Sequence, residues 1–350
     1  MSVLAFQKLS GPKANRIASQ EYQEKRSRLL QKPRIFLELT NWCSFRCVYC
    51  SGRLEERPKG YMGAELLQSL IREVIDWKVP HPVNVAVDGE PLLYPDFNEV
   101  VQSLSAGGLN VNVATNGSLL GDRHRRLPID FYISISVNEE DFAYRRSSIP
   151  FDRYYGRLID FVRYRKEYAI PGNITLQVSE MKEFLENRKT LKREIVDHES
   201  MAVKIHKLLK DLDIVEWDVP RIRATIQHTN VFKVFETGAF RLSVRAHKIV
   251  ATNWRLCYRS YEEMPVVEYG YCDAPWTLLT VLWDGTVTHC CTDLSGRTVI
   301  GNVKEAPLRE IWFGKKAQAV RDAFDHWKVP HGICQRCLHR ISENAKIMVP

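Results

Sequence analysis

The alternation of strand-like and helix-like segments constrains the fold of this chain more than any other feature. Short apolar runs typical of buried strands occur at residues 35–40, 83–87, 110–114, 131–136, 173–178 and 213–218. Helical patterns lie between most of them, at residues 63–77, 96–107, 151–167 and 200–211. This alternation indicates βαβ units whose right-handed crossovers curl a parallel sheet into a complete or partial barrel. We therefore predict a partial (β/α)6, TIM-like barrel with its active site at the carboxyl ends of the strands.

The pattern changes in the last third of the chain. Residues 220–270 show no clear period and are interpreted as a connector or a substrate-covering segment. The run TLLTVLW, then Asp284-Gly285 and TVTHCC, predicts a β-hairpin, because Asp-Gly favours a tight turn with positive φ. A helix is expected at about 306–327. The predicted organisation is an N-terminal helical extension (1–33), the barrel (34–222), the connector (223–270) and a small α+β domain (271–350).

Composition places the chain among ordinary soluble proteins. It has 350 residues, 45% hydrophobic and 26% charged. No apolar run approaches the length of a membrane span, and the N-terminus lacks a secretory signal pattern, so we expect a cytoplasmic protein without membrane partners. The net charge of +8 admits an anionic substrate or partner, although ordinary solvated faces are the favoured explanation. No nucleic-acid-binding motif sharpens that choice.

The cysteines are grouped, which favours metal or redox chemistry over disulfides. Cys43, Cys47 and Cys50 follow the first predicted strand with gaps of three and two residues. Three thiolates in one loop can hold three irons of a [4Fe–4S] cube and leave the fourth iron open to a small molecule. Zinc fits this triplet poorly, because it usually takes four ligands and favours CxxC knuckles. The loop also falls on the predicted catalytic face of the barrel.

The residues around this loop, LELTNWCSFRCVYC, resemble the radical S-adenosylmethionine (radical SAM) superfamily, with Tyr49 as the usual aromatic residue before the last cysteine. Further matches follow successive strands: Gly89-Glu90-Pro91, Thr115-Asn116-Gly117, Ser136 with Asn138, and Gln177. The resemblance implies that these residues bind S-adenosylmethionine, with GEP at the methionine amino group and Ser136 and Asn138 at the ribose. Asp88 departs from the family, which usually has a second glycine there.

A second set of cysteines lies in the C-terminal region: Cys272, Cys290, Cys334 and Cys337. Four thiolates from a hairpin and a CxxC loop can close an iron–sulfur cluster or a zinc site, and spacing alone leaves both open. The surrounding CDAPW, DGTVTHCC and EIWFG resemble the auxiliary-cluster domain called SPASM. No cysteine follows Cys337, so the resemblance is to the shortened, one-cluster version called twitch. It implies a second, auxiliary [4Fe–4S] cluster.

Two cysteines and several histidines remain. Cys291 adjoins a predicted ligand and is interpreted as a packed thiol, with replacement of Cys290 as the alternative. Cys257 is either a buried, unreactive cysteine or the hydrogen-atom donor of a radical epimerase. His289 is expected to be structural, while His331 and His339 either tune a cluster through hydrogen bonds or lie at the surface.

The resemblance implies a function. The enzyme would cleave S-adenosylmethionine to a 5′-deoxyadenosyl radical that abstracts hydrogen from a substrate C–H bond. We expect net oxidation of a small polar metabolite, of the sugar, cyclitol or nucleotide type, with the auxiliary cluster as electron acceptor. The alternatives are a peptide- or protein-modifying maturase, an epimerase that uses Cys257, and a non-enzymatic iron–sulfur or zinc-stabilised protein. A flavodoxin or ferredoxin-type protein would supply electrons, and natural product biosynthesis is the expected setting.

Overall fold

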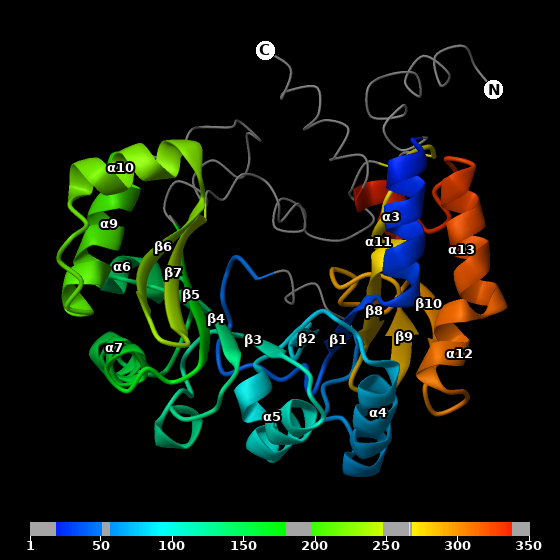
Figure 1. Cartoon of the computed structure of the whole chain (residues 1–350), viewed down its shortest axis with the longest axis horizontal. Coiled ribbons are helices and arrows are strands. Elements are labelled where there is room, and N and C mark those ends of the chain that lie inside the picture. The colour runs from blue at the N-terminus through cyan, green and yellow to red at the C-terminus, as the bar shows by residue number, and fades with distance from the viewer. Residues whose placement is uncertain (1–18, 51–56, 180–197, 248–265, 267, 338–350) are drawn as a thin grey trace.

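The computed structural model describes residues 19–50, 57–179, 198–247, 266 and 268–337 (Figure 1). The strands are β1 (Arg34–Leu37), β2 (Val83–Asn84), β3 (Val111–Thr115), β4 (Asp130–Ile135), β5 (Gly172–Ser179), β6 (Val231–Thr237), β7 (Phe240–His247), β8 (Leu278–Val281), β9 (Thr286–Thr288) and β10 (Val299–Asn302). The α-helices are α3 (Gln20–Gln31), α4 (Ala64–Trp77), α5 (Phe97–Ala106), α6 (Glu139–Ala143), α7 (Phe151–Glu167), α9 (His198–Asp211), α10 (Val219–His228), α11 (Ala274–Thr277), α12 (Leu308–Phe313) and α13 (Lys315–Asp325), and short 3₁₀ helices are η2 (Pro91–Leu93) and η3 (Asp122–His124).

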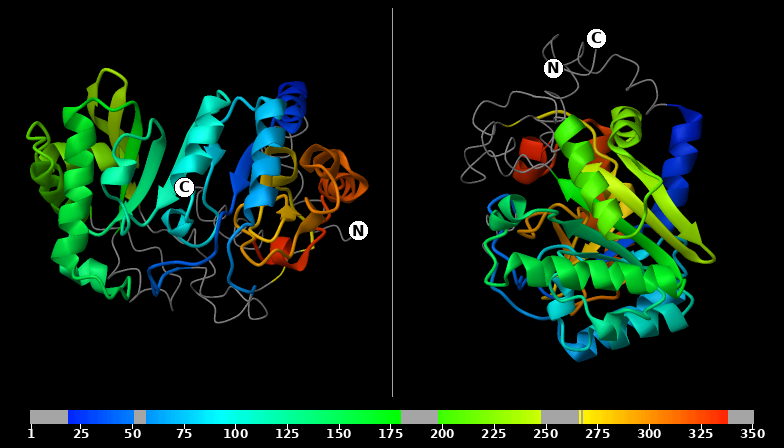
Figure 2. Two further views of the ribbon diagram at one scale, coloured as in Figure 1. Left: turned by 90° about the horizontal axis from the view of Figure 1, so that it is seen from below. Right: turned by 90° about the vertical axis from the view of Figure 1, so that its left-hand side faces the viewer.

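The strands form one sheet in the order β10-β9-β8-β1-β2-β3-β4-β5-β7-β6. Every pair from β1 to β5 in that order, and the pair β5–β7, is parallel. In Figure 1 the helices α4, α5 and α7 lie along the lower side of this curved sheet, and the view from below in Figure 2 shows them crossing over it. The predicted α/β fold with a partial barrel is confirmed.

Alternation along the strands decides which side chains face the helices. Phe131 of β4 meets Phe161 of α7 edge to face, with ring centroids 5.2 Å apart. Ile133 and Ile135, two and four residues further, are equally buried. Successive side chains of a strand point to opposite faces, so Tyr132 and Ser134 face the other, concave side of the sheet. That side of the sheet therefore carries polar side chains.

The sixth parallel strand is not the predicted one. Residues 213–218 form no strand, because the side chain of Asp218 accepts a hydrogen bond from the Arg221 amide (2.8 Å) and caps α10 instead. The sixth strand is β7, which pairs with β5 and, through a turn at Gly238 (φ +53°), with the antiparallel β6. The prediction that residues 220–270 are irregular is therefore wrong over β6 and β7. Its two-residue alternation, as in VFKVF and FRLSV, was the overlooked signal.

The C-terminal hairpin extends the barrel sheet. β8 pairs in parallel with β1 over four residues and antiparallel with β9, and Gly285 between them has φ +90° as the predicted Asp-Gly turn requires. The helix expected at 306–327 is instead two helices, α12 and α13, which Gly314 separates. Trp312 of α12 is fully buried, and its indole N–H donates to the Leu30 carbonyl (2.8 Å). The C-terminal region is thus tied to the N-terminal helix and to the first barrel strand.

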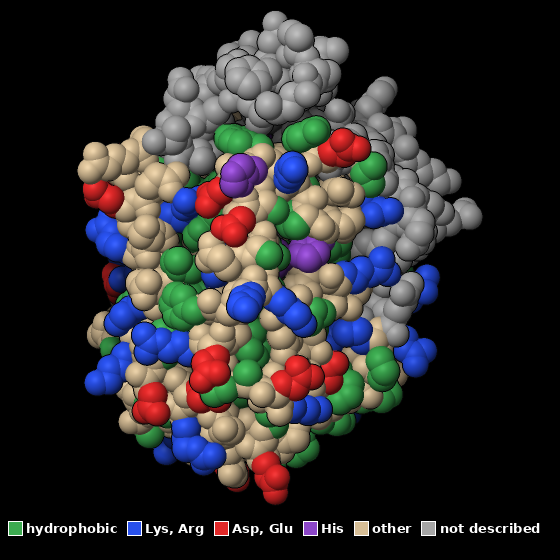
Figure 3. Space-filling model, turned by 90° about the vertical axis from the view of Figure 1, so that its right-hand side faces the viewer, with side chains coloured by type: hydrophobic (Ala, Val, Ile, Leu, Met, Phe, Trp, Pro, Cys, Tyr) green, Lys and Arg blue, Asp and Glu red, His purple; other side chains and the backbone are tan. Residues whose placement is uncertain are grey.

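No helix among the described residues is long and apolar enough to cross a membrane. On the face shown in Figure 3, basic and acidic side chains lie interspersed.

Candidate active site

The three-cysteine loop follows β1 and is held by backbone hydrogen bonds to the segment after β4. The amides of Arg46 and Val48 donate to the carbonyls of Arg145 (3.0 Å) and Tyr144 (2.9 Å). Cys43 is exposed, whereas Cys47 and Cys50 are half-buried. The loop therefore has a fixed backbone and presents its thiols at the edge of the structure.

Gly89 lies directly against the start of this loop. It has φ +74°, and a Cβ atom at this position would lie 2.6 Å from the Trp42 carbonyl oxygen. The next amide, that of Glu90, donates to the same oxygen (2.7 Å). Only glycine fits such a conformation and such a close backbone approach. The predicted GEP motif and the cysteine loop are thus in contact.

Asp88 replaces the family's second glycine without backbone strain, since its φ is not positive. Its amide donates to the Glu38 carboxylate (3.3 Å), and its own carboxylate lies 3.6 Å from the Lys59 ammonium. Lys59 in turn donates to the Asn41 carbonyl (2.9 Å). The departure from the family pattern therefore adds a polar contact beside the loop.

Glu90 joins the ends of two strands. It is 1% exposed; one carboxylate oxygen accepts from the Thr115 hydroxyl (2.7 Å) and the Leu92 amide (3.2 Å), and the other from the Asn116 amide (2.8 Å). Burial raises the pKa of Glu90 to about 7, although these donors oppose the shift. Its charge is therefore poised to change near neutrality, and a cationic ligand would hold it ionised.

Asn116 reaches the cysteine loop from β3. Its side-chain amide nitrogen lies 3.6 Å from the Cys43 sulfur and donates to the Ser44 hydroxyl (3.2 Å). Ser44 also shares a hydrogen bond with Ser118 (2.7 Å). The structure thus brings the predicted TNG segment to the first cysteine.

Arg145 is a central residue that the sequence analysis missed. It is 3% exposed, and its Nε donates to the Ser136 hydroxyl (2.7 Å) while an Nη donates to the Ser134 carbonyl (2.8 Å). Burial alone would lower its pKa, but Tyr154, Tyr49 and other acidic groups facing it raise the pKa above the ordinary value. Arg145 therefore remains a cation. Its only sequence signal is its position in YRR, just after the fourth strand.

Tyr49 and Cys47 lie beside this cation. Burial raises the pKa of Cys47, while the nearby Arg145 charge and a hydrogen bond with Tyr49 oppose that rise. Burial also raises the pKa of Tyr49, so its hydroxyl stays protonated. The Tyr49 hydroxyl and the Arg145 charge both favour a thiolate at Cys47.

Two other predicted residues have partners away from the loop. The Asn138 side chain accepts from the Asp141 amide (2.8 Å) and caps α6. Gln177 accepts a hydrogen bond from the Tyr132 hydroxyl on the concave face of the sheet. Their predicted roles toward the ribose and the rest of S-adenosylmethionine stay predictions.

The second set of cysteines gathers from separate elements. Cys272 precedes α11, Cys290 follows β9, and Cys334 and Cys337 lie beyond α13. Burial first, and then the neighbouring Cys290 and Cys337, raise the pKa of Cys272 to about 12. Burial, then Cys290, Cys272 and Cys337, likewise raise the pKa of Cys334. The four side chains are therefore near enough to influence one another's charge.

The raised pKa values of these thiols suit the binding of a positively charged metal cluster. Buried thiols that repel one another as thiolates need a positive group to be stable when ionised, and metal ions supply one. At the first loop, Cys43 reaches the surface, yet desolvation by the surrounding protein raises its pKa to about 11. Among the described residues, no group of three or more histidine, cysteine or acidic side chains is close enough to hold a single metal ion. Cys291 is half-buried beside Cys290, and Cys257 and His339 lie outside the described residues.

His289 and His331 stack beside the second set. Their ring centroids are 5.5 Å apart with an interplanar angle of 29°. Burial lowers the pKa of His289 to about 3 and also lowers that of His331. Both rings are therefore neutral at physiological pH. The stacked pair fits the structural role that the sequence predicted for His289.

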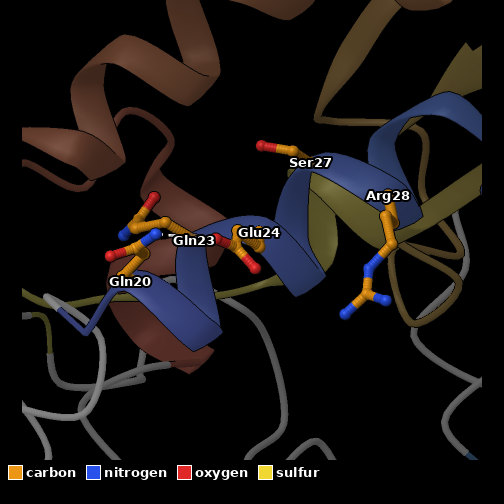
Figure 4. A pocket seen from close by; sticks show the side chains of 5 residues that line it. All are labelled: Gln20, Gln23, Glu24, Ser27 and Arg28. Atoms are coloured by element: carbon orange, nitrogen blue, oxygen red, sulfur yellow. Dashed lines mark hydrogen bonds between the residues drawn. The ribbon is translucent and has the colours of Figure 1, made fainter.

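A surface pocket of about 560 Å³ lies apart from the cysteines. It is lined by one helix, α3, through Gln20, Gln23, Glu24, Ser27 and Arg28 (Figure 4). Gln20 and Glu24 are hydrogen-bonded to each other (2.9 Å). None of its lining residues belongs to the predicted site.

Two family models match the chain in the expected order. The radical SAM superfamily matches residues 37–183, and the iron–sulfur cluster-binding SPASM domain matches residues 272–338. The chain belongs to the radical SAM superfamily. Its cofactors are accordingly S-adenosylmethionine, the [4Fe–4S] cluster that binds it, and an auxiliary iron–sulfur cluster.

Relatives of this radical SAM protein differ in what they act on. It is 22% identical over 310 residues to the tungsten-containing aldehyde ferredoxin oxidoreductase cofactor-modifying protein of Pyrococcus furiosus, covering 81% of each chain. A mycofactocin maturase of Mycobacterium ulcerans is 35% identical over 80 residues, which are 23% of this chain and 21% of the maturase. The structure of Streptococcus suis SuiB bound to its precursor peptide SuiA is similar in fold, with a TM-score of 0.52 and 13% identity over 94% of this chain and 76% of SuiB.

Proposed function

We propose that this radical SAM enzyme oxidises a small polar metabolite, with Cys43, Cys47 and Cys50 holding the cluster that binds S-adenosylmethionine. The observation that carries the proposal is the contact of the cysteine loop with the polar ends of three neighbouring strands. Gly89, Glu90 and Asn116 meet the loop from β2 and β3, and Arg145 meets it after β4. When bound, the cluster and S-adenosylmethionine supply a 5′-deoxyadenosyl radical that abstracts hydrogen from a C–H bond.

The protein's own residues bind and orient. Glu90, whose pKa burial raises to about 7, would accept hydrogen bonds from the methionine ammonium and be held ionised by it. Arg145 donates a hydrogen bond to Ser136 and faces Cys47. It therefore holds this side of the cysteine loop in place and puts a positive charge beside it. These groups need no movement in the backbone to act, because each is already hydrogen-bonded to a strand end.

The second set of cysteines favours oxidation of the substrate as the net reaction. Cys272, Cys290, Cys334 and Cys337 would hold the second cluster, and a one-electron acceptor suits a substrate radical that ends as a ketone. β8, which precedes Cys290, pairs directly with β1, which precedes the cysteine loop. Cys290 itself follows β9, which only β8 separates from β1 in the sheet.

A peptide-modifying maturase is the second candidate. The mycofactocin maturase is similar to this chain in sequence. SuiB, which is similar to this chain in fold, was solved with a precursor peptide. Peptide crosslinking also ends in a net oxidation, so both candidates use the same cysteine sets. The substrate alone separates them.

The test is anaerobic turnover. Reconstituted, reduced protein should convert S-adenosylmethionine to 5′-deoxyadenosine, and Cys47→Ala should abolish this. Small-molecule and peptide fractions of the source organism, supplied separately, should be screened by mass spectrometry for a product lighter by two hydrogens. A product in the peptide fraction would replace the first candidate by the second, and no 5′-deoxyadenosine from the wild type with either fraction would refute both.

The epimerase alternative depends on Cys257, which lies outside the described residues. We expect Cys257→Ala to retain turnover and the product made in D₂O to carry no new carbon-bound deuterium. Deuterium in the wild-type product, together with loss of turnover in the variant, would make the enzyme an epimerase.

A further inference from the structure

Arg245 lies on the concave face of the sheet, on a strand that the S-adenosylmethionine residues do not use. In the strand register Ser134 is opposite Gln177, and Gln177 is opposite Arg245. The residues on either side of Arg245, Val244 and Ala246, are fully buried in the core on the opposite face. Arg245 thus ends a polar row that runs across β4, β5 and β7.

The guanidinium of Arg245 is fixed at one end only. One Nη donates to the Tyr132 hydroxyl (3.0 Å), which itself donates to the Gln177 side chain. The Arg245 Nε is buried and has no hydrogen-bond partner among the described residues. Nor does any described carboxylate lie within ion-pair distance of it. The edge formed by Nε and the other Nη therefore has no hydrogen-bond partner among the described residues.

Arg165 also has a buried Nε without a described partner, but both of its Nη groups are satisfied. They donate to the carbonyls of Leu127 (2.6 Å) and Pro171 (2.8 Å). Arg241, four residues before Arg245 on the same strand, pairs with Glu236 (2.8 Å) in solvent. A half-buried guanidinium with an unpartnered donor costs free energy unless a ligand satisfies it.

We propose that Arg245, positioned by Tyr132, binds an oxyanion of the substrate, a carboxylate or a phosphate. The Nε and Nη edge of a guanidinium matches two oxygens of either group through parallel hydrogen bonds. S-adenosylmethionine also has a carboxylate, but a second buried cation, Arg145, already lies beside the cysteine loop. The inference rests on the proposed function only in assigning the anion to the substrate, and it restricts that substrate to anionic molecules.

The experiment measures anion binding without turnover. The anaerobically reconstituted, full-length protein is titrated calorimetrically with inorganic phosphate and, separately, with acetate. We expect one site per chain for one of the two anions, and that anion identifies the group. Arg245→Gln should weaken binding by about tenfold or more, because hydrogen bonds to a charged group are lost. Arg241→Gln, on the same strand, is the matched control and should bind like the wild type.

Each other outcome overturns the proposal. It is wrong if neither anion binds the wild type, or if Arg245→Gln binds phosphate and acetate unchanged. It is also wrong if Arg245→Gln loses affinity for S-adenosylmethionine while anion binding stays. If circular dichroism shows that Arg245→Gln does not fold, the Tyr132→Phe variant is tested instead. This variant keeps the guanidinium of Arg245 but removes the hydroxyl that positions it. Unchanged anion binding in Tyr132→Phe would refute the proposed role. No reductant is present, so failure here is separate from failure of wild-type 5′-deoxyadenosine formation.

Discussion

The two cysteine sites are built in different ways. The first takes its three thiols from one loop, and other strands hold that loop from outside through Arg145, Gly89 and Asn116. The second takes its thiols from separate elements and brings them near enough that the other cysteines raise the pKa of Cys272 and that of Cys334. A cluster that must leave one iron open needs polar groups beside it, whereas a closed cluster needs only its cysteines. The surroundings, more than the cysteines, distinguish the two sites.

The largest expected effect comes from removing each site in turn. Changing Cys43, Cys47 and Cys50 to Ala should abolish 5′-deoxyadenosine formation and leave about four irons per chain of about eight. Changing Cys290 and Cys334 to Ala should also leave about four irons, but should retain cleavage of S-adenosylmethionine. Iron analysis and product assay check both. One zinc with four irons in the unaltered protein would contradict the auxiliary-cluster assignment and spare the first.

The next effect tests whether the first site depends on its surroundings. Gly89→Ala forces a Cβ to 2.6 Å from the Trp42 oxygen at φ +74°, so the loop must shift. We expect the affinity for S-adenosylmethionine to fall roughly a hundredfold, because misplaced ligand groups lose about 3 kcal/mol. The matched control is Gly63→Ala, since a Cβ at Gly63 meets nothing within 4 Å. Equal affinities in the two variants, measured by equilibrium dialysis, would show that the loop is insensitive to GEP.

Glu38 ties the two regions together. It is completely buried just after β1, and accepts two hydrogen bonds from Arg57 (both 2.9 Å) and one from the Trp283 amide of the C-terminal hairpin (3.1 Å). Arg57 also donates to the Leu294 carbonyl (2.6 Å). A buried pair broken on one side is strongly destabilising.

We therefore expect Glu38→Ala to lower the free energy of unfolding by about 3 kcal/mol and to loosen the C-terminal hairpin. Chemical denaturation measures the first effect and hydrogen exchange of the hairpin amides the second. The exposed Glu99 on α5 provides a control, because Glu99→Ala should change stability by less than about 0.5 kcal/mol. Hairpin exchange that is unchanged in Glu38→Ala would mean that Glu38 does not hold the hairpin to the barrel.

Local patterns explain why much of this could be predicted from sequence. The Asp-Gly turn, the βα alternation and the first cysteine set depend on neighbours in the chain, and residues 151–167 form α7 as expected. Arg145 and Arg245 were missed because their roles depend on partners from other strands, Ser136 for one and Tyr132 for the other. The sixth strand was missed because Asp218 starts a helix where an apolar run indicated a strand.

The smallest expected effect concerns His124. This residue belongs to neither cysteine site, so its variant tests the stability of the barrel without removing a cluster ligand. It is completely buried, edge to face with Phe97 (5.9 Å), and burial lowers its pKa from 6.5 to about 4. The unfolded chain therefore takes up the proton first, and stability is lost as the pH falls from 6.5 toward 4. At pH 5 the loss relative to pH 7 is up to about 2 kcal/mol. Denaturant unfolding at both pH values should show a smaller difference in His124→Gln than in the wild type, while the exposed His326→Gln retains the full difference. Equal pH dependence in all three proteins would show that His124 is not the acid-sensitive group.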